Sequence, residues 1–342
     1  MFTFVLYPSL TQAQVTEDLP AAKDNTLFQD ATGALSNGAG SHIFAGSIIL
    51  DPIQVRRALL QFDIAGSIPA GSTITDVVLQ LNMSRTIAAS FDVSLHHVNA
   101  DWGEGTSQAP GQEGAGDPSA TDDATWIHRF FSTSEWTTPG GDFEAGASAT
   151  TAVDGLGAYE WGSTAGMVAD VQGWLDSPST DFGWIVLGDE TVQTTAKRFD
   201  SRENPVAANR PVLSVTYTPP SFPIQSNLSP AFIEEGALLQ LTAPDGGSYQ
   251  WKKDGSNVSD GGNISGSNAQ TLVFDTVLET DEGTYTAEFD TSGKAVVETE
   301  PFVLAVLPAG SVPGANAWGL TLLTLLVLLA GVSYLFRVCA VR

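Results

Sequence analysis

Cysteine is almost absent from this chain of 342 residues. Its single cysteine, Cys339, lies three residues before the end. A disulfide framework, a zinc quartet or a Cys-x-x-Cys redox motif therefore cannot form within one copy of the chain. We expect Cys339, which has no partner thiol, to be incidental to the structure.

Basic residues are scarce as well. The chain has 14 Lys and Arg against 39 Asp and Glu, which gives a formal net charge of -25. Phosphate contacts need cationic side chains, so this balance excludes nucleic acid as a partner and argues against docking on anionic lipid head groups. It is compatible with an extracytoplasmic surface and with divalent cations.

Known catalytic motifs are also lacking. The sequence has no G-x-S-x-G, H-E-x-x-H, P-loop or dinucleotide fingerprint. His96 and His97 are adjacent on an expected strand, where successive side chains face opposite ways, so they are poorly placed to share a metal. We expect no enzyme. A polysaccharide-degrading enzyme is the less favoured alternative, using an unmarked carboxylate pair or His128 near Tyr159.

A long apolar run lies at the end of the sequence. Residues 318–336 are uncharged and rich in leucine, with Trp318 and Tyr334 near the two ends. This pattern predicts one C-terminal transmembrane helix, which is also the expected contact with the membrane. Arginines follow the run, so residues 337–342 are expected in the cytoplasm and the bulk of the chain outside.

The spacer at residues 308–317 contains the dipeptide Val312-Pro313, followed by Trp-Gly-Leu and the apolar run. This order resembles the bacterial sorting signals of the PEP-CTERM and IPTL-CTERM kind, which implies processing by an exosortase-like membrane protease. A permanent anchor is the alternative, because Gly314 and Ala315 depart from those signals. At the other end, residues 1–20 resemble a remnant or atypical signal peptide, with a cleavage point after Ala13.

Two domains are expected between these ends. Prolines in residues 219–223 cannot donate to a sheet ladder and indicate a linker. Before it, residues 21–218 contain short alternating segments that predict an all-β jelly-roll sandwich. Strands are expected at Arg56 to Ile64, Thr75 to Met83, Phe91 to Val98, Phe182 to Gly188 and Pro211 to Thr218, and one helix has the apolar face Met167, Val168, Val171, Trp174 and Leu175.

Residues 224–307 predict a second, smaller β domain. Trp251 suits an inner strand, and a D-x-G-x-Y pattern that ends at Tyr285 is typical of a tyrosine corner. The pattern resembles the immunoglobulin fold, with Ala287 where the second cysteine would lie. We therefore expect an immunoglobulin-like β-sandwich without the disulfide, in which Trp251 and Tyr285 are structural.

An acidic, Gly-rich loop at residues 101–126 is a candidate site. Carboxylate oxygens on a flexible loop suit calcium, and a solvated loop without an ion is the alternative. Aromatic faces also stack on sugar rings. The predicted calcium ligands are Asp101, Glu104, Asp122 and Asp123, and the predicted carbohydrate contacts are Trp102, Glu104, Trp126 and Arg202.

Charge is concentrated in AKRFDSREN, residues 196–204. Together with KDNTLFQD, RRALLQFDI, DWGEG, DATW, ADVQGWL and RPVLSVTY, this segment resembles the DNRLRE family, which is classed with carbohydrate-binding module family 96. The resemblance covers nearly all of residues 21–218. It implies a carbohydrate-binding class without naming the glycan.

Arg202 and Glu203 are neighbours on an expected strand, so their side chains should face opposite ways and need separate partners. Arg57 and Asp63 are the expected partners. This arrangement predicts a structural charge network, because unpaired buried charge is too costly to keep. Direct ligand binding by Arg202 is the alternative.

These features predict an exported, surface-anchored, non-enzymatic protein that binds a polysaccharide or surface glycan, or mediates adhesion. Like charges repel, so neutral glycans or calcium-dependent binding suit a chain this acidic. A purely structural stalk or matrix protein is the alternative. It predicts that every tryptophan is buried, whereas a binding module predicts exposed tryptophan and acidic groups on a concave face.

Overall fold

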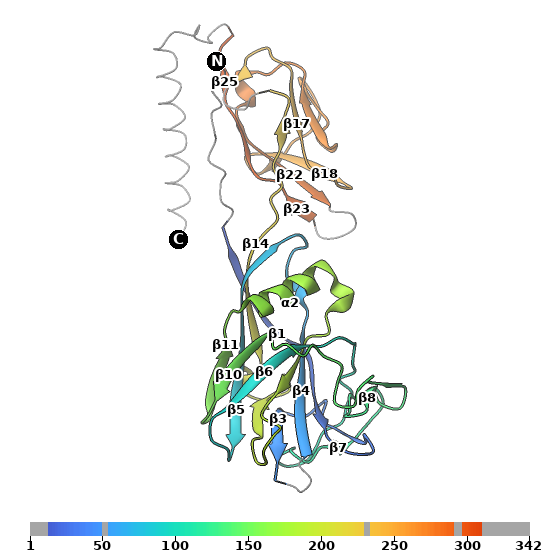
Figure 1. Ribbon diagram of the computed structural model, residues 1–342. Helices are drawn as coiled ribbons and strands as arrows, with labels where there is room; N and C mark the ends of the chain where they lie inside the picture. Colours follow the sequence, from blue (N-terminus) through green and yellow to red (C-terminus); the bar gives the residue numbers. More distant parts are fainter. Residues whose placement is uncertain (1–12, 50–53, 229–232, 291–295, 310–342) are drawn as a thin grey trace. The chain divides into compact units, whose positions relative to one another are not determined.

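The computed structural model describes residues 13–49, 54–228, 233–290 and 296–309 (Figure 1). The chain forms two compact units, residues 1–220 and 221–342, and their boundary lies inside the proline-containing segment 219–223. Most of the regular secondary structure in the described residues is β-strand, which confirms the all-β prediction.

Several predicted features lie outside the described residues: most of the signal peptide, the sorting motif Val312-Pro313, the apolar run 318–336 and the tail 337–342. Among the described residues, no helix has the length and apolar character needed to cross a membrane.

The first unit contains the strands expected from the alternating segments. Its elements are β1 (Val15–Phe28), β2 (Leu35–Ser36), β3 (His42–Ile48), β4 (Gln54–Phe62), α1 (Ile64–Ser67), β5 (Thr73–Thr86), β6 (Phe91–His97), β7 (Asp117–Pro118), β8 (His128–Phe130), β9 (Ser134–Glu135), β10 (Ala149–Val153), β11 (Gly157–Trp161), α2 (Ala165–Asp176), η1 (Pro178–Thr180), β12 (Trp184–Leu187), β13 (Lys197–Asp200), η2 (Ala207–Asn209) and β14 (Val212–Thr218). The five predicted strands correspond to β4, β5, β6, β12 and β14, and the predicted helix to α2.

The main strands of this unit form two antiparallel sheets that share β1 and β3. One sheet runs β1-β14-β5-β13-β3, with β11 also paired to β5, and the other runs β1-β4-β12-β6-β10. Residues 15–20 of β1 pair with β14, and residues 21–28 pair with β4. Strand β3 changes sheet in the same way, pairing first with β13 and then, from Gly46 onward, with β4.

Residues 15–20 were predicted to belong to the signal-peptide remnant, and this part of the prediction is wrong. They form the first half of β1 and pair in register with β14, for example Leu19 with Leu213. Leu19 is buried in the core, so the segment is an integral part of the sheet. Cleavage after Ala13 would leave the whole strand in place.

The core of the first unit lies between the two sheets and under α2. On β5 alternate residues face inward, among them Leu79, Leu81 and Met83. Helix α2 begins at the cap residue Thr164, whose hydroxyl accepts a hydrogen bond from the Met167 amide. Its predicted apolar face is buried, and Trp174 packs edge-on against Trp184 with ring centroids 4.7 Å apart.

The second unit is an immunoglobulin-like β fold with its own core. Its elements are β15 (Gln225–Ser226), β16 (Ile233–Glu234), β17 (Leu239–Thr242), β18 (Tyr249–Lys253), β19 (Ser256–Asn257), β20 (Ile264–Ser265), β21 (Thr271–Phe274), η3 (Glu279–Asp281), β22 (Gly283–Asp290), β23 (Val296–Glu298), β24 (Phe302–Leu304) and β25 (Val306–Leu307). One sheet has the order β15-β17-β21-β20 and the other β19-β18-β22-β23, with β24 also on β22. The short strands β16 and β25 pair in parallel.

Trp251 and Tyr285 hold the centre of this second unit. Trp251 on β18 is fully buried and lies opposite Ala287 on β22. The hydroxyl of Tyr285 donates a 2.7 Å hydrogen bond to the backbone carbonyl of Asp281, which is the geometry of a tyrosine corner. The hydrogen bond fixes the turn before β22, and packing such as that of Tyr285 against Phe274 of β21 connects the sheets where other immunoglobulin-like domains use a disulfide.

Candidate functional site

A polar triplet on β1, Lys23-Asp24-Asn25, connects the strand to the acidic loop at residues 101–126. The Lys23 ammonium lies 2.9 Å from the Asp101 carboxylate and 4.4 Å from the centre of the Trp102 ring. The Asn25 amide donates a 2.8 Å hydrogen bond to the backbone carbonyl of Glu104. The loop is therefore held against the sheet by charge and hydrogen bonds rather than lying free in solvent.

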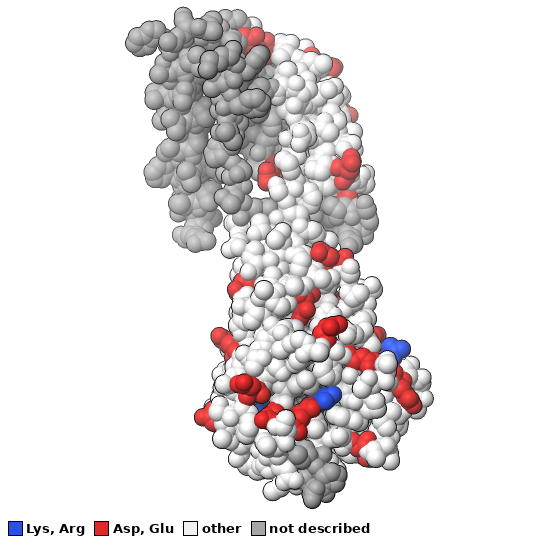
Figure 2. All heavy atoms as spheres, viewed as in Figure 1, with Lys and Arg blue, Asp and Glu red and all other residues white. Residues whose placement is uncertain are grey.

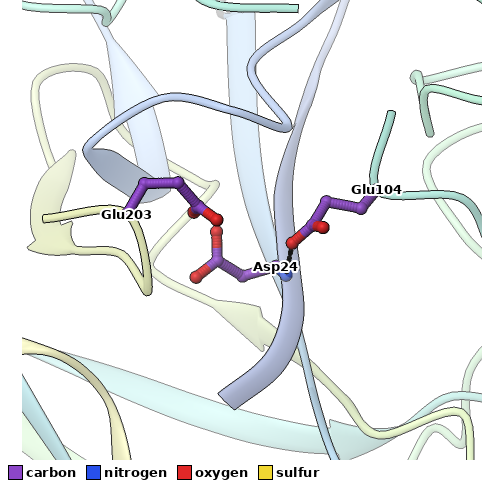
Figure 3. Close-up of side chains that lie close together, drawn as sticks. All are labelled: Asp24, Glu104 and Glu203. Atoms are coloured by element: carbon purple, nitrogen blue, oxygen red, sulfur yellow. Dashed lines mark hydrogen bonds between the residues drawn. The ribbon is translucent and has the colours of Figure 1, made fainter. Parts of the chain in front are cut away.

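Three carboxylates meet at this junction (Figure 3). Asp24 comes from β1, Glu104 from the acidic loop and Glu203 from the turn after β13, and each can offer an oxygen within 4.8 Å of the others. The backbone amide of Asp24 donates to Glu104 Oε1 at 2.9 Å. Asp24 Oδ2 accepts a 2.7 Å hydrogen bond from the backbone amide of Arg202.

Arg202 is the cation of this junction. Its Nη1 lies 3.0 Å from both oxygens of Glu104 and 2.5 Å from Glu203 Oε1. Glu203 therefore contacts its own neighbour, because the two residues lie in a turn after β13 and not on a strand. The prediction that the two side chains face opposite ways is wrong.

The predicted partners Arg57 and Asp63 are also wrong for this network. Arg57 forms a bidentate pair with Glu190, with both N–O distances at 2.8 Å. Asp63 accepts a 2.9 Å hydrogen bond from the Gly66 amide and caps α1. The partner of Arg57 is 133 residues away, which spacing along the chain does not reveal, whereas Asp63 is used locally as a helix cap.

Two carboxylate oxygens of the junction are buried and have no hydrogen-bond partner in the described part of the chain. They are Asp24 Oδ1 and Glu203 Oε2, and the two carboxylates lie next to each other in Figure 3. Burial raises the pKa of Asp24 well above its usual value, against the opposing effect of the Arg202 amide. Burial likewise raises the pKa of Glu203, and the Arg202 charge opposes this.

The predicted calcium ligands are not gathered around one point. Asp101 pairs with Lys23, and Asp122 is exposed. Asp123 is buried and accepts hydrogen bonds from the backbone amides of Ala120 and Ser107. Of the four predicted ligands Asp101, Glu104, Asp122 and Asp123, Glu104 alone belongs to the acidic cluster, so the structure does not bring this set together.

A shallow depression of about 670 Å³ lies on another part of the first unit. The Arg57 guanidinium forms part of its wall and lies 4.8 Å from the ring centre of Trp126 and 5.3 Å from that of Phe143. Its Nη1 also donates to the carbonyl of Gly140 at 2.8 Å. The other residues that line the depression are Asn99, Ala100, Thr137, Thr138, Pro139, Gly141, Asp142 and Phe143.

The tryptophans are mostly core residues. Trp102 is fully buried, and its indole N–H donates to the carbonyl of Phe182 at 2.9 Å. Its ring has no exposed face for a sugar, so the predicted stacking role of Trp102 is corrected. Among the tryptophans that the structure describes, Trp126 alone is half-buried, and it lies beside the depression.

A second polar group joins α2 to the sheet. Asp170 of α2 lies 3.1 Å from His97 Nδ1 and accepts hydrogen bonds from the Trp184 indole at 2.7 Å and the Ser148 hydroxyl at 2.5 Å. The Ser148 hydroxyl donates to the aspartate and not to the histidine. In a serine hydrolase the serine hydroxyl is hydrogen-bonded to the histidine, so this arrangement differs from that triad. The contacts of this group were not predicted, because its members come from four segments that are distant in sequence.

His128 and Tyr159, the pair named for an enzyme, use their polar atoms elsewhere. His128 Nδ1 lies 3.1 Å from the Thr125 hydroxyl, and its ring packs edge-on against Phe131. The Tyr159 hydroxyl donates to the carbonyl of Gly155 at 2.8 Å. Neither contact directs one residue toward the other.

Acidic side chains are scattered over the face of the molecule shown in Figure 2, and basic side chains there are few. Several of the scarce bases are used within the protein, as in the pairs Arg57–Glu190 and Arg202–Glu104. A negative surface of this kind repels anionic ligands unless cations bridge them.

Asp24 and Glu190, the partners of Arg202 and Arg57, were also not singled out from the sequence. A signal for Asp24 was available, because Lys23-Asp24-Asn25 interrupts an otherwise strand-like segment with polar residues. Asp24 and Asn25 are buried, and buried polar groups need partners. No comparable signal exists for Glu190, which lies in a loop after β12.

No protein-family model matches the chain, and no curated protein shows significant similarity to it. The resemblance to the DNRLRE family therefore remains a prediction.

Solved structures show only weak likeness. The Ig-like domain of human Leucine-rich repeat-containing protein 4 is 25% identical over 27% of this chain and 91% of its own length, with a TM-score of 0.21. Drosophila OTK extracellular domains 3-5 are 24% identical over 26% of this chain and 36% of theirs, with a TM-score of 0.20. The mouse nectin-like molecule 4 ectodomain is 10% identical over 87% of this chain and 96% of its own, with a TM-score of 0.23. Scores this low carry no argument about function.

Proposed function

We propose that this chain is an exported, non-enzymatic surface protein whose first unit binds carbohydrate. In this proposal the first unit is a jelly roll of the DNRLRE type and the immunoglobulin-like unit is its stalk. The segment beyond residue 309 supplies the sorting signal and the membrane anchor.

The observation that supports carbohydrate binding is the depression beside Trp126. Its volume of about 670 Å³ falls in the range of small-ligand sites. Asn99, Thr137 and Thr138, which have polar side chains, line it together with the aromatic Phe143. The amide nitrogen of Asn99 donates to Glu144 at 3.1 Å, so its carbonyl oxygen is the group proposed to accept from a sugar hydroxyl. Sugars present hydroxyl groups on their edges and C–H groups on their faces, so this mixture suits them.

The charge of the chain narrows the ligand class. Arg57 lies in the wall of the depression, but Glu190 and the carbonyl of Gly140 already occupy its guanidinium nitrogens. Asp142 adds a carboxylate, which accepts hydrogen bonds from the amides of Thr137 and Thr138. The site has no uncommitted cation among its lining residues, so we propose neutral glycans as the ligands.

The test is a glycan array followed by calorimetry on the whole chain. Asn99→Ala should weaken binding about fivefold, the value of one hydrogen bond. Trp126→Phe should weaken it less, because Trp126 packs against Arg57 in the wall and does not itself line the depression. The control is Leu156→Ala, a side chain that is 70% exposed in the turn after β10 and lines no part of the depression.

A purely structural stalk is the second candidate function. It is supported by the complete burial of four tryptophans, Trp102, Trp161, Trp174 and Trp184. Buried tryptophans cannot stack on a sugar, so Trp126 is the tryptophan that remains near the depression. Absence of saturable glycan binding by a folded chain would favour the stalk. Equal glycan affinity of the Asn99→Ala and Leu156→Ala variants would instead show that the depression is not the binding site.

A further inference from the structure

The acidic cluster of Asp24, Glu104 and Glu203 lies in the first unit and has no role in the depression. Its carboxylates come from three segments that are distant in sequence: β1, the loop at 101–126 and the turn after β13. Oxygens bound to one calcium ion at 2.3–2.6 Å lie up to about 5 Å apart, so a spread of 4.8 Å suits a single ion.

The charge of the cluster is not balanced from within. The Arg202 guanidinium contacts Glu104 and Glu203 but not the Asp24 carboxylate. The charge of Arg210 also acts on Glu203, so the three ionised carboxylates keep an excess of at least one negative charge. Lys23, the next base in sequence, pairs with Asp101 instead. A divalent cation would offset this excess.

Two oxygens are already positioned for such an ion. The side chain of Asp24 is fully buried, and its Oδ1 has no hydrogen-bond partner among the described residues. The same holds for Glu203 Oε2, and Figure 3 shows the two carboxylates directed at each other. Buried carboxylate oxygens are normally hydrogen-bonded or bound to a metal, so two facing ones without partners call for a ligand between them.

The donor set indicates which cations fit. All the available ligands are carboxylate oxygens, which suit calcium and other hard divalent ions and do not suit zinc, whose sites use sulfur and nitrogen. The side chains of Glu104 and Glu203 are 23% and 25% exposed, so water can complete the coordination from the solvent side.

We propose that Asp24, Glu104 and Glu203 together bind one divalent cation of the calcium class. The ion joins β1, the acidic loop and the turn after β13, and it adds to the hydrogen bonds and ion pairs that Lys23, Asn25 and Arg202 already form between these segments. Calcium thus belongs at this junction and not at the loop residues Asp101, Asp122 and Asp123. This inference is independent of whether the depression binds a glycan.

The test uses the whole chain, freed of metal with EDTA and titrated with calcium by calorimetry. Terbium provides a second probe, because energy transfer from a nearby tryptophan such as Trp102 makes bound terbium luminescent. One saturable site is expected. Asp24→Asn and Glu203→Gln should each weaken it at least tenfold, while Asp122→Asn, at an exposed loop carboxylate, should leave it unchanged.

Thermal unfolding of the unmutated chain gives a measurement that does not depend on a variant folding. Calcium should raise the melting temperature at neutral pH, and EDTA should reverse the rise. The proposal is overturned if no saturable binding occurs at millimolar calcium, or if Glu203→Gln binds as tightly as the unmutated chain. It is also overturned if Asp24→Asn raises the melting temperature while calcium has no effect, because the two carboxyl groups then share a proton and not an ion.

Discussion

Asp181 is a carboxylate whose ionisation opposes folding. Burial raises its pKa to about 7, while hydrogen bonds from the amides of Ile64 and Gly183 act in the opposite direction. The charge of Asp63 raises the pKa further. One of its oxygens, Oδ1, is buried without a partner among the described residues.

We expect Asp181→Asn to stabilise the first unit at alkaline pH. The pKa of Asp181 is higher in the folded than in the unfolded chain, so the proton on its carboxyl group stabilises the fold. This stabilisation is complete below about pH 4 and is lost as the pH rises through about 7. The variant cannot ionise, so its advantage should be near zero at pH 4 and about 1–3 kcal/mol at pH 8, allowing for partial exposure. Chemical denaturation at both values measures it. Equal advantages at pH 4 and pH 8 would contradict the prediction, and exposed Asp76→Asn is the control.

At the scale of elements, the sandwich depends on two strands that change sheet. Strand β3 does so between Ala45 and Gly46, and Gly46 has a φ of +108° that side chains rarely adopt. A Cβ there would lie 3.0 Å from the Cα of Ala196. The glycine is therefore required by both backbone conformation and space.

Gly46→Ala should destabilise the first unit by about 1–3 kcal/mol, because it strains the crossing of β3. Gly173→Ala is the matched control, since Gly173 lies within α2 and a Cβ there meets nothing within 4 Å. The control should stabilise by about 0.5–1 kcal/mol through helix propensity. Urea denaturation compares the two, and shifts of the same sign would refute the interpretation.

At the scale of the whole molecule, the two units have separate hydrophobic cores. The first is built around residues such as Leu79 and Trp184, and the second around Trp251, Phe274 and Tyr285. Separate cores in one chain are expected to unfold separately.

Calorimetry of the chain should therefore show two thermal transitions. Tyr285→Phe removes the hydrogen bond to the Asp281 carbonyl and should cost about 1–2 kcal/mol in the second unit. For a domain of this size that lowers one transition by roughly 4–15 °C. Gly46→Ala should lower the other. A single transition that both substitutions move together would show that the units unfold as one.

Local patterns were sufficient for much of the fold. Alternation of apolar residues located β4, β5, β6, β12 and β14, and the spacing of the apolar residues located the buried face of α2. Each of these depends on neighbours a few residues apart. The sheet-changing strands were not predictable in this way, because the second half of β1 has Lys23, Asp24 and Asn25 where an apolar alternation would be expected.

The candidate sites were less predictable. Glu104 and Arg202 were singled out, but their meeting with Asp24 was not, because Asp24 lies 80 residues from Glu104 and 178 from Arg202. A cation site was predicted in the acidic loop from its composition alone. Its Asp101 and Asp123 are instead taken up by Lys23 and by backbone amides.

The sequence by itself determined the all-β class, the positions of the main strands and the excess of acidic charge. These properties follow from short-range periodicity and from composition. Only the tertiary structure decided which charges meet, which tryptophan stays partly exposed and which carboxylate oxygens of the described residues are left without a partner. Those outcomes depend on contacts between strands distant in sequence, and burial of a charge is set by everything packed around it.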